Sequence, residues 1–306
     1  MAEARPSFTR ELTWRFEAFG YDLGTGLGRL FPTEWIAAFG GLFFRTFGNF
    51  TRPGRIARRN IEIAFPTWTD EQRARLLEAQ WDCLGRTFFE FPLTHRLTLK
   101  SGRVELVGGE RLAEIARSGK PVIFVSGHFS NWEVMPSVIV ESGVPCRMTY
   151  RAANNPYIDR RIRETRARYG VKLFAPKGGV GSRDLLETLK GGESVALMND
   201  QKFNEGVAAP FFGRTVLTAG GPSRLALKFG AALQPMWMHR LPGGRFRVYV
   251  DPPIHLENTG DREADIEAGV RQINAYVEAR IRERPEEWFW VHKRWPNEDY
   301  QRGAET

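Results

Sequence analysis

A histidine and a glutamate, five positions apart, stand in a polar cluster directly after a short apolar segment. Residues 127–133 read Gly-His-Phe-Ser-Asn-Trp-Glu, which gives an imidazole, a hydroxyl, an amide and a carboxylate in close succession. A carboxylate that orients an imidazole leaves the second ring nitrogen to take a proton from an attacking hydroxyl group, which is worth about 10²–10⁴ in rate. In a continuous helix, residues five positions apart diverge by about 140°. His128 and Glu133 can therefore meet only if His128 lies in a turn and Glu133 lies in the first turn of the following helix.

The same cluster also has a purely structural interpretation. Ser130 and Glu133 have the spacing of a capping box, in which the two side chains satisfy the first backbone amides of a helix. A helix cap beside a hydrogen-bonded histidine, and a histidine that acts as a general base, fit these residues about equally well.

The surrounding pattern predicts a strand before the polar cluster and a helix after it. Residues 122–125 are a run of β-branched and aromatic residues between a proline and a glycine, as in a strand buried on both faces. Apolar residues return with helical spacing from Val134 onward. Strand, polar turn and helix is the order that places side chains at the carboxyl edge of an α/β sheet, where such folds bind their ligands.

Strand and helix patterns alternate from residue 103 to residue 284. We expect strands near residues 104–107, 122–125, 147–150, 171–174, 195–198, 233–238 and 245–250. We expect helices near residues 110–117, 134–139, 159–169, 183–189, 222–229 and 263–284. This alternation predicts an α/β fold with a central, mostly parallel sheet flanked by helices. With no repeat or linker visible, residues 1–306 are expected to form one domain, with a helical N-terminal region at 1–66 and an α/β core at 67–306.

The N-terminal region is rich in aromatic residues, glycine and arginine. One helical face is apolar over residues 12–30, and residues 35–44 carry no charge. Ten residues are too few to cross a bilayer, which takes about 20. An apolar stripe most often packs on a core, but a cluster of arginines follows this one and favours an anionic membrane surface, where each contributes about 1 kcal/mol. These arginines are Arg45, Arg52, Arg55, Arg58 and Arg59.

Composition narrows the possible classes of protein. The chain has 306 residues, of which 42% are hydrophobic and 26% are charged, as expected of a packed globular protein rather than a disordered one. Its net charge of +8 implies an anionic partner, which could be nucleic acid, a membrane surface or a phosphorylated substrate. Cys83 and Cys146 form neither a disulfide framework nor a zinc motif, and we expect no metal and no cofactor. The first residues do not resemble a signal peptide, so we expect the protein to remain inside the cell.

Residues 127–133 resemble the signature of the bacterial lipid A biosynthesis acyltransferases, the lauroyl and myristoyl transferases of the lysophospholipid acyltransferase superfamily. That superfamily is marked by a histidine, four residues and an acidic residue. The similarity continues in order over most of the chain, in Arg-Arg-Asn-Ile-Glu-Ile-Ala-Phe-Pro at 58–66, Tyr-Arg at 150–151, Asn-Asp-Gln at 199–201, Pro-Phe-Phe-Gly at 210–213 and Trp-Val-His-Lys-Arg-Trp at 290–295. It implies a fold like that of glycerol-3-phosphate acyltransferase.

The resemblance also implies an activity and a location. The protein would move a fatty acyl chain from acyl carrier protein to a hydroxyl group of a lipid A precursor, an anionic lipid, at the cytoplasmic face of the inner membrane. His128 would deprotonate that hydroxyl group. Glu133 would orient the imidazole, or Asp200 would, because an acidic residue at the matching position pairs with the catalytic histidine in some members of the superfamily. The expected substrate-binding residues are Arg166, Arg151, Asn131, Gln201, Phe211 and Phe212.

Several of these residues also have purely structural explanations. Arg166 lies in a run of five arginines over residues 160–168, which is usually a solvated helix face, although arginine is well suited to bind phosphate. Phe211 and Phe212 could line an acyl channel or form an ordinary packed turn. A turn-forming Asn-Asp pair would explain residues 199–200.

Other activities remain to be weighed against acyl transfer. The arginines cluster beside an apolar helix rather than alternating with stacking aromatics on strands, so we expect no nucleic acid partner. No Gly-x-Ser-x-Gly elbow and no His-Glu-x-x-His motif occur in the sequence, which leaves direct transfer without a metal or a covalent intermediate. A lysophospholipid, an inositol mannoside or an aminoacyl lipid would offer similar acceptor groups. A non-catalytic, membrane-associated relative is a further alternative.

Overall fold

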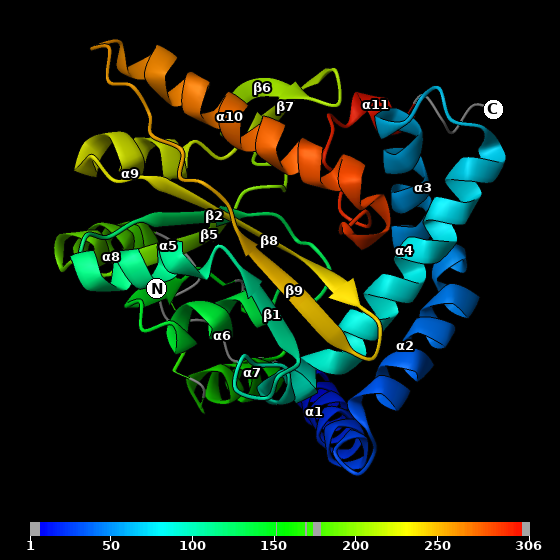
Figure 1. Ribbon diagram of the computed structural model, residues 1–306. Helices are drawn as coiled ribbons and strands as arrows, with labels where there is room; N and C mark the ends of the chain where they lie inside the picture. The colour runs from blue at the N-terminus through cyan, green and yellow to red at the C-terminus, as the bar shows by residue number, and fades with distance from the viewer. Residues whose placement is uncertain (1–6, 151, 169, 174–178, 302–306) are drawn as a thin grey trace.

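The computed structural model describes residues 7–150, 152–168, 170–173 and 179–301. A seven-stranded sheet has the order β1-β9-β8-β2-β5-β3-β4 (Figure 1), and all neighbours are parallel except β8 and β9. The strands are β1 (Val104–Val107), β2 (Ile123–Ser126), β3 (Cys146–Met148), β4 (Lys172–Leu173), β5 (Ser194–Met198), β8 (Leu233–Leu241) and β9 (Arg245–Val250). The predicted α/β fold with a mostly parallel sheet is confirmed, and each of the seven predicted strands matches one of these.

The central strand β2 determines where the polar cluster lies. All four of its residues are buried, because strands flank both of its edges and helices cover both faces. Ser126 at the end of β2 pairs with Met198 at the end of β5. The chain therefore leaves both strands at the same level, and His128 and Asp200, each two residues further on, emerge together at the carboxyl edge of the sheet.

Two apolar clusters lie on opposite faces of the sheet, as the alternation of side chains along a strand requires. Phe124 belongs to one cluster, together with residues of α5 (Gly109–Ser118) and α6 (Val134–Glu141). Ile123 and Val125 belong to the other, together with residues of α8 (Gly179–Lys190), α9 (Gly221–Phe229) and α10 (Arg262–Glu283). Figure 1 shows α9 and α10 on one side of the sheet and α6 on the other, and helices on both faces are what the sequence predicts.

An antiparallel hairpin that the sequence pattern does not predict packs against α10. It is formed by β6 (Val207–Phe211) and β7 (Arg214–Thr218). Its two-residue turn has left-handed backbone at Phe212 and Gly213, with φ of 50° and 71°. Turns of this kind favour glycine or asparagine at both positions, so Phe212 hides the usual sequence signal of a hairpin.

The N-terminal helices are α1 (Phe8–Gly28), α2 (Thr33–Phe47), α3 (Arg52–Ala64) and α4 (Asp70–Glu90), with the short 3₁₀ helices η1 (Gly48–Phe50) and η2 (Phe91–Arg96). Helix α4 opens with a capping box of Thr69 and Gln72. Glycines allow α2 and α4 to approach closely, since a Cβ atom at Gly40 would lie 2.5 Å from the carbonyl oxygen of Gly85. These two helices therefore form one rigid layer.

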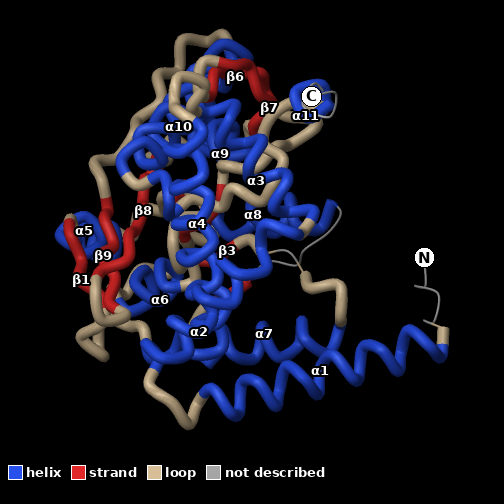
Figure 2. The backbone as a smooth tube through the Cα atoms, turned by 90° about the vertical axis from the view of Figure 1, so that its right-hand side faces the viewer, coloured by secondary structure: helices blue, strands red, loops and turns tan. Residues whose placement is uncertain are grey.

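Helix α1 lies alongside α7 (Pro156–Arg168) and extends beyond the body of the molecule (Figure 2). The side-chain amide of Asn155 donates to the carbonyl oxygen of Trp14 at 2.8 Å, and Arg161 pairs with Asp22. Polar contacts thus fix α1 to the core, although most of its large apolar side chains remain exposed. The last elements of the described chain are the 3₁₀ helix η3 (Pro285–Glu287) and α11 (Glu298–Gln301).

Candidate active site

Asp200 is the carboxylate that the fold brings to His128. Nδ1 of His128 lies 2.7 Å from Oδ1 of Asp200, and the backbone N–H of His128 donates to Oδ2 at 2.7 Å. The indole N–H of Trp288 donates to the same Oδ2 at 2.8 Å. The Asp200 side chain is 1% exposed, whereas that of His128 is 18% exposed. The carboxylate therefore fixes the imidazole from its buried side and leaves Nε2 as the nitrogen that can exchange a proton with a ligand.

The two members of this pair shift each other's pKa in opposite directions. Burial on its own would lower the pKa of His128, but the charge of Asp200 and its hydrogen bond outweigh burial and raise that pKa above its ordinary value. Burial would likewise raise the pKa of Asp200, but the imidazolium charge and the hydrogen bonds from His128 and Trp288 hold it well below the usual range. Asp200 is therefore ionised at neutral pH and stabilises the protonated imidazole.

The loop that carries His128 is held by η3 and the segment that follows it. The backbone N–H of Ser130 donates to the carbonyl oxygen of Glu287 at 2.7 Å, and that of Phe289 donates to the carbonyl oxygen of His128 at 3.1 Å. Ser130 has a left-handed backbone with φ of 46°, and α6 begins only at Val134, without a side-chain cap. The capping-box interpretation of Ser130 and Glu133 is therefore wrong, because the chain is still in an irregular turn at Ser130.

A buried ionic network supports the middle of the same loop. The side-chain amide of Asn131 donates to Glu90 at 3.0 Å, and the guanidinium of Arg240 donates to Glu90 at 2.9 Å. The backbone N–H of Arg240 in turn donates to the carboxylate of Glu287 at 3.0 Å. Asn131 is fully buried, so it positions the loop and does not line the pocket, contrary to the substrate-binding role expected for it. Burial raises the pKa of Glu287 to about 7.

Glu133 binds a different partner from the one expected. Its carboxylate accepts two hydrogen bonds from the guanidinium of Arg166 on α7, one of them at 2.8 Å. The two side chains are 13% and 17% exposed. The prediction that Glu133 orients the imidazole is therefore wrong in its geometry. Glu133 stands past the irregular turn and acts on the imidazole through its charge.

A pocket of about 640 Å³ opens beside His128. Apolar residues of β2, β3, β5 and α6 line its interior, including Met135, Ile139, Met148 and Met198. His128 and the Glu133–Arg166 pair also line it, and Trp132 packs edge-on against the imidazole with ring centres 5.0 Å apart. Such a pocket can hold a hydrocarbon chain with its reactive end at the imidazole.

A model of the bacterial lipid A biosynthesis acyltransferases matches residues 8–297. The chain belongs to this family. A lipid A biosynthesis acyltransferase from Haemophilus influenzae is 25% identical over 77% of this chain and 73% of its own length. The lipid A biosynthesis lauroyltransferase of Escherichia coli is 25% identical over 90% of this chain and 84% of its own length. The resemblance seen in the sequence is thus confirmed.

A solved structure of the 1-acyl-sn-glycerophosphate acyltransferase of Thermotoga maritima also matches, with 14% identity and a TM-score of 0.36. It covers 83% of this chain and 97% of its own.

The remaining residues expected to bind substrate in the acyltransferase differ in their burial and packing. Gln201 follows Asp200 and is half-buried. Phe211 is fully buried against Trp288 and Trp295, and Phe212 packs on Phe211. The expectation that these two phenylalanines line an acyl channel is therefore wrong, and the packed turn is what the structure shows. Arg151 lies outside the described residues.

The sequence blocks that resemble the family but lie outside the pocket pack against one another. The side-chain amide of Asn60 in α3 donates to the carbonyl oxygens of Trp290 and His292, at 2.5 and 2.8 Å. Arg294 donates to Thr218 in β7. These contacts hold the segment after η3, which in turn binds the loop of His128 and supplies Trp288 to Asp200. The N-terminal region, the hairpin and the C-terminal segment of the acyltransferase thus support the loop that carries His128.

Sequence reasoning missed Glu90, Arg240, Glu287 and Trp288 in this support. For Glu90 and Arg240 the sequence does contain a signal, because both charges lie in apolar stretches and a buried charge needs a partner. Glu287 and Trp288 carry no such signal. Over the described ranges of the chain, no three His, Cys, Asp or Glu side chains gather as metal ligands would.

Proposed function

We propose that this acyltransferase transfers a fatty acyl chain from an acyl carrier protein thioester to a hydroxyl group of a lipid A precursor, with His128 as the general base. The observation that carries the proposal is the pairing of His128 with Asp200 at the mouth of an apolar pocket. Family membership supports acyl transfer to a lipid A precursor. The thioester donor and the roles of the residues are our proposal.

The reaction follows from the geometry of the imidazole. Asp200 accepts the hydrogen bond from Nδ1–H, so Nε2 carries the lone pair that takes the proton of the acceptor hydroxyl group. The acceptor oxygen attacks the thioester carbonyl carbon and forms the new ester bond. The carbon–sulfur bond breaks, and the imidazolium returns its proton to the departing thiolate. Asp200 stabilises the imidazolium throughout and stays ionised.

The pocket beside His128 is the proposed site of the donor chain. Its inner walls are apolar and come from the centre of the α/β core. A thioester with its chain buried there would place its carbonyl group at the imidazole. Arg166, held in place by Glu133, is the arginine that lines the mouth of the pocket in the described part of the chain, and we assign it the acceptor phosphate.

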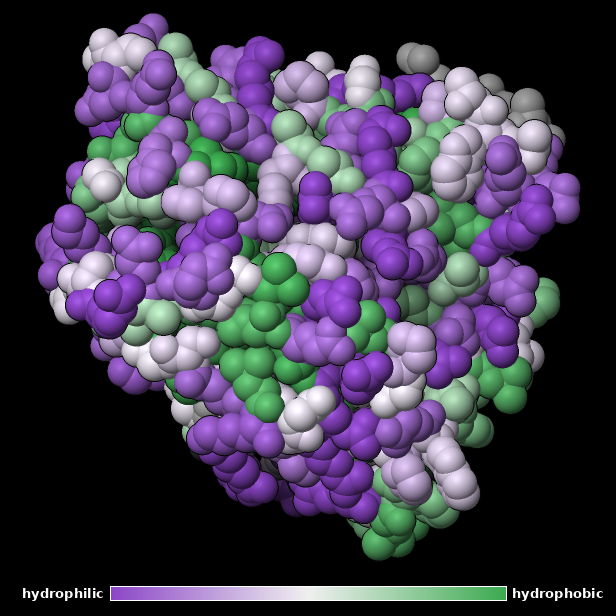
Figure 3. Space-filling view, viewed as in Figure 1, coloured by the Kyte–Doolittle hydropathy of each residue, from purple (hydrophilic) through white to green (hydrophobic). Residues whose placement is uncertain are grey.

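The exposed apolar face of α1 and α2 is the proposed membrane contact. Large side chains along both helices are exposed, among them Phe16, Phe19, Trp35, Phe39 and Phe43. Figure 3 shows hydrophobic side chains gathered over α1 and α2 at the lower right of the molecule. None of the described helices is both long and apolar enough to span a bilayer. We therefore propose peripheral attachment at the cytoplasmic face of the inner membrane.

Transfer itself tests the proposal. Purified enzyme is given a lipid A precursor in mixed micelles with lauroyl-acyl carrier protein or lauroyl-coenzyme A, and mass spectrometry identifies the product. We expect an acylated precursor with the carrier protein donor, and a loss of about 10²–10⁴ in kcat for His128→Ala. Near-normal transfer by His128→Ala would overturn the assigned base. Acylation of a lysophospholipid instead of the precursor would overturn the assigned acceptor.

Vesicle binding tests the membrane surface separately. Removing two exposed phenylalanines in Phe16→Ser/Phe19→Ser should weaken binding to anionic vesicles at least tenfold, because burying each ring contributes about 1.5–3 kcal/mol. The matched control is Thr9→Ser/Thr13→Ser on the same helix. A gel shift with duplex DNA at the same salt concentration checks the alternative of nucleic acid binding, and retention of DNA but not of vesicles would reject the proposed surface.

A further inference from the structure

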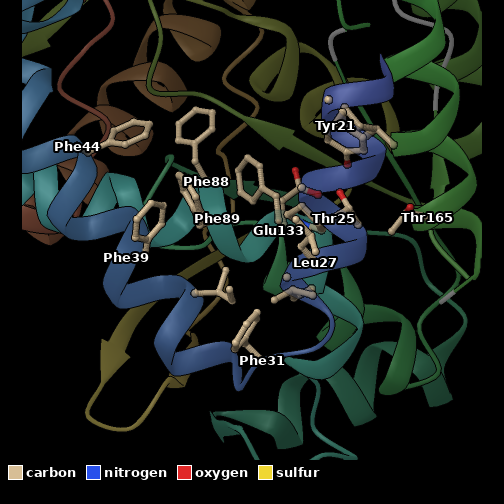
Figure 4. A pocket seen from close by; sticks show the side chains of 18 of the residues that line it. Tyr21, Thr25, Leu27, Phe31, Phe39, Phe44, Phe88, Phe89, Glu133 and Thr165 are labelled. Atoms are coloured by element: carbon tan, nitrogen blue, oxygen red, sulfur yellow. The ribbon is translucent and has the colours of Figure 1, made fainter. Parts of the chain in front are cut away.

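A second pocket, of about 740 Å³, lies between the N-terminal helices and the core. Residues of α1, α2, the end of α4, η2 and α7 form its walls, as Figure 4 shows. Phenylalanines dominate the lining, and the polar groups are few. The lining includes Phe31, Phe39, Phe44, Phe88, Phe89 and Phe91. Of this lining, the reaction proposed above uses only the Glu133–Arg166 pair.

Helix α1 contributes a wall without side chains. Gly20, Gly24 and Gly28 line the pocket at intervals of four residues, so they share one face of the helix. A Cβ atom at Gly20 or Gly24 would meet nothing within 4 Å, so the space in front of them is open. In contrast, the glycines at the α2–α4 contact, Gly40 and Gly85, have no room for a Cβ atom. The glycines of α1 thus widen a cavity, whereas those of α2 and α4 close a packing contact.

The two pockets meet at the Glu133–Arg166 ion pair. Both of these residues line the pocket beside His128 and also the second pocket. Figure 4 shows Glu133 at the centre of the second pocket, among phenylalanines and the side chain of Thr25. A molecule in the second pocket therefore has its inner end at the same ion pair that borders the imidazole.

The other end of the second pocket reaches the exposed apolar face. Leu27, Phe31 and Phe39 line the pocket and are at the same time exposed large apolar residues. The pocket beside His128 instead runs into the α/β core, between the sheet and α6. One pocket thus begins where a lipid would leave a bilayer, and the other ends inside the protein.

We propose that the second pocket holds an acyl chain of the acceptor lipid, while the pocket beside His128 holds the chain of the donor. This inference rests on the proposed function. An acceptor lipid that presents a hydroxyl group to Nε2 of His128 must place its own hydrocarbon out of water. The second pocket offers phenylalanine walls for the chain, a cation at its inner end for the headgroup phosphate, and continuity with the proposed membrane face.

Filling the second pocket tests the inference. Gly24→Trp places a large side chain in the open space in front of α1. Gly26→Trp is the matched control, because Gly26 also has nothing within 4 Å of an added Cβ atom and does not line the pocket. Both changes replace glycine in a helix, which favours the helix rather than weakening it. Thr165→Phe fills the pocket from α7 and serves as a second variant if Gly24→Trp alters folding.

We expect Gly24→Trp and Thr165→Phe to raise KM for the lipid A precursor at least tenfold, with KM for the acyl thioester and the pH profile unchanged. Gly26→Trp should match wild type in both KM values and in the pH profile. A rise in KM for the thioester instead would overturn the assignment of the chains, because the second pocket would then hold the donor. Unchanged constants in both filled variants would overturn the second pocket as a lipid site.

Photolabelling separates failure of this inference from failure of the proposed function. The probe is a lipid A precursor with a diazirine near the end of one acyl chain, applied at equal concentration to each variant. We expect labelled peptides from α1, α2 and α4 in wild type and in Gly26→Trp, and at least a tenfold loss of that label in Gly24→Trp. Label confined to β3, β5 and α6 would overturn the second pocket. An inactive wild-type enzyme that still labels α1 and α2 would instead refute the proposed reaction and keep the lipid site.

Discussion

Two carboxylates act on His128, and they differ in their contacts and in their burial. Asp200 is buried beneath the imidazole and accepts hydrogen bonds from the ring, from the backbone of His128 and from Trp288. Glu133 borders both pockets and is bound by Arg166. The first carboxylate is 72 residues from the histidine in sequence and touches it, whereas the second is five residues away and does not. Closeness in the chain is thus a poor guide to which acid pairs with a histidine.

The register of the sheet explains the difference. β2 and β5 end level with each other, so residues that follow their ends meet whatever their separation in sequence. The loop from His128 to Glu133 instead passes through the left-handed Ser130 before α6 begins, and this turn carries Glu133 away from the ring toward α7. A histidine followed after four residues by an acid can therefore serve two tasks, the proposed proton transfer at His128 and the positioning of the Arg166 guanidinium by Glu133.

The largest effect should come from Asp200→Asn. The new amide would present an N–H to Nδ1 and favour the tautomer in which Nε2 carries the proton and cannot act as a base. We expect kcat to fall by about 10³–10⁴, with the fold and vesicle binding retained. Measuring kcat beside a far-ultraviolet circular dichroism spectrum checks this. A loss below tenfold would mean that Asp200 holds the loop without serving the base.

Glu90→Gln probes the loop that joins the two carboxylates. The change leaves the buried guanidinium of Arg240 without its main counter-charge and weakens the hold on Asn131. Breaking a buried ion pair costs about 3–5 kcal/mol, and we expect the free energy of unfolding in urea to fall by about that amount. Glu78→Gln, exposed on the same helix, is the control and should change it little. An unchanged urea midpoint for Glu90→Gln would show that the network contributes nothing to stability.

Glu133→Gln should have a smaller effect, and of a different kind. Hydrogen bonds to charged groups are worth about 1.5–3 kcal/mol, so we expect KM for the acceptor to rise about 10–100-fold while kcat changes little. Glu164→Gln, at an exposed ion pair on α7, is the control. A fall in kcat as large as that of Asp200→Asn, at an unchanged KM, would erase the distinction between the two carboxylates.

The sequence predicts the core of this fold because its strands are short apolar runs separated by helices with clear spacing. It also places His128 correctly at the end of a buried strand. The choice between Asp200 and Glu133 stays open from sequence alone, because it depends on the register of β2 against β5, which no local pattern encodes. Phe211 and Phe212 mislead for a related reason, since aromatic residues after a strand look the same whether they line a channel or pack in a turn.

The N-terminal region is a second case in which the sequence pattern does not determine the three-dimensional contacts. The sequence shows the apolar stripe, but it does not show whether those side chains pack on the core or stay exposed. The structure shows that α2 packs on α4 through glycines while α1 leaves most of its large side chains exposed. The second pocket arises only where α1 lies beside α7, a contact made by Asn155, Arg161 and Tyr157 that no repeating pattern announces.

The smallest effect, a shift in pH dependence, separates the two carboxylates most cleanly. In the proposed mechanism transfer requires neutral imidazole, so kcat/KM should rise with pH through the pKa of His128, which Asp200 holds above the ordinary value of about 6.5. Without Asp200, burial dominates and lowers that pKa, so the imidazole of Asp200→Asn, followed by NMR, should titrate below 6.5. Glu133 adds the weakest of the charge effects on His128, so the kcat/KM midpoint of Glu133→Gln should fall only slightly. If the pKa of His128 fell further in Glu133→Gln than in Asp200→Asn, Glu133 rather than Asp200 would be the main electrostatic support of the base.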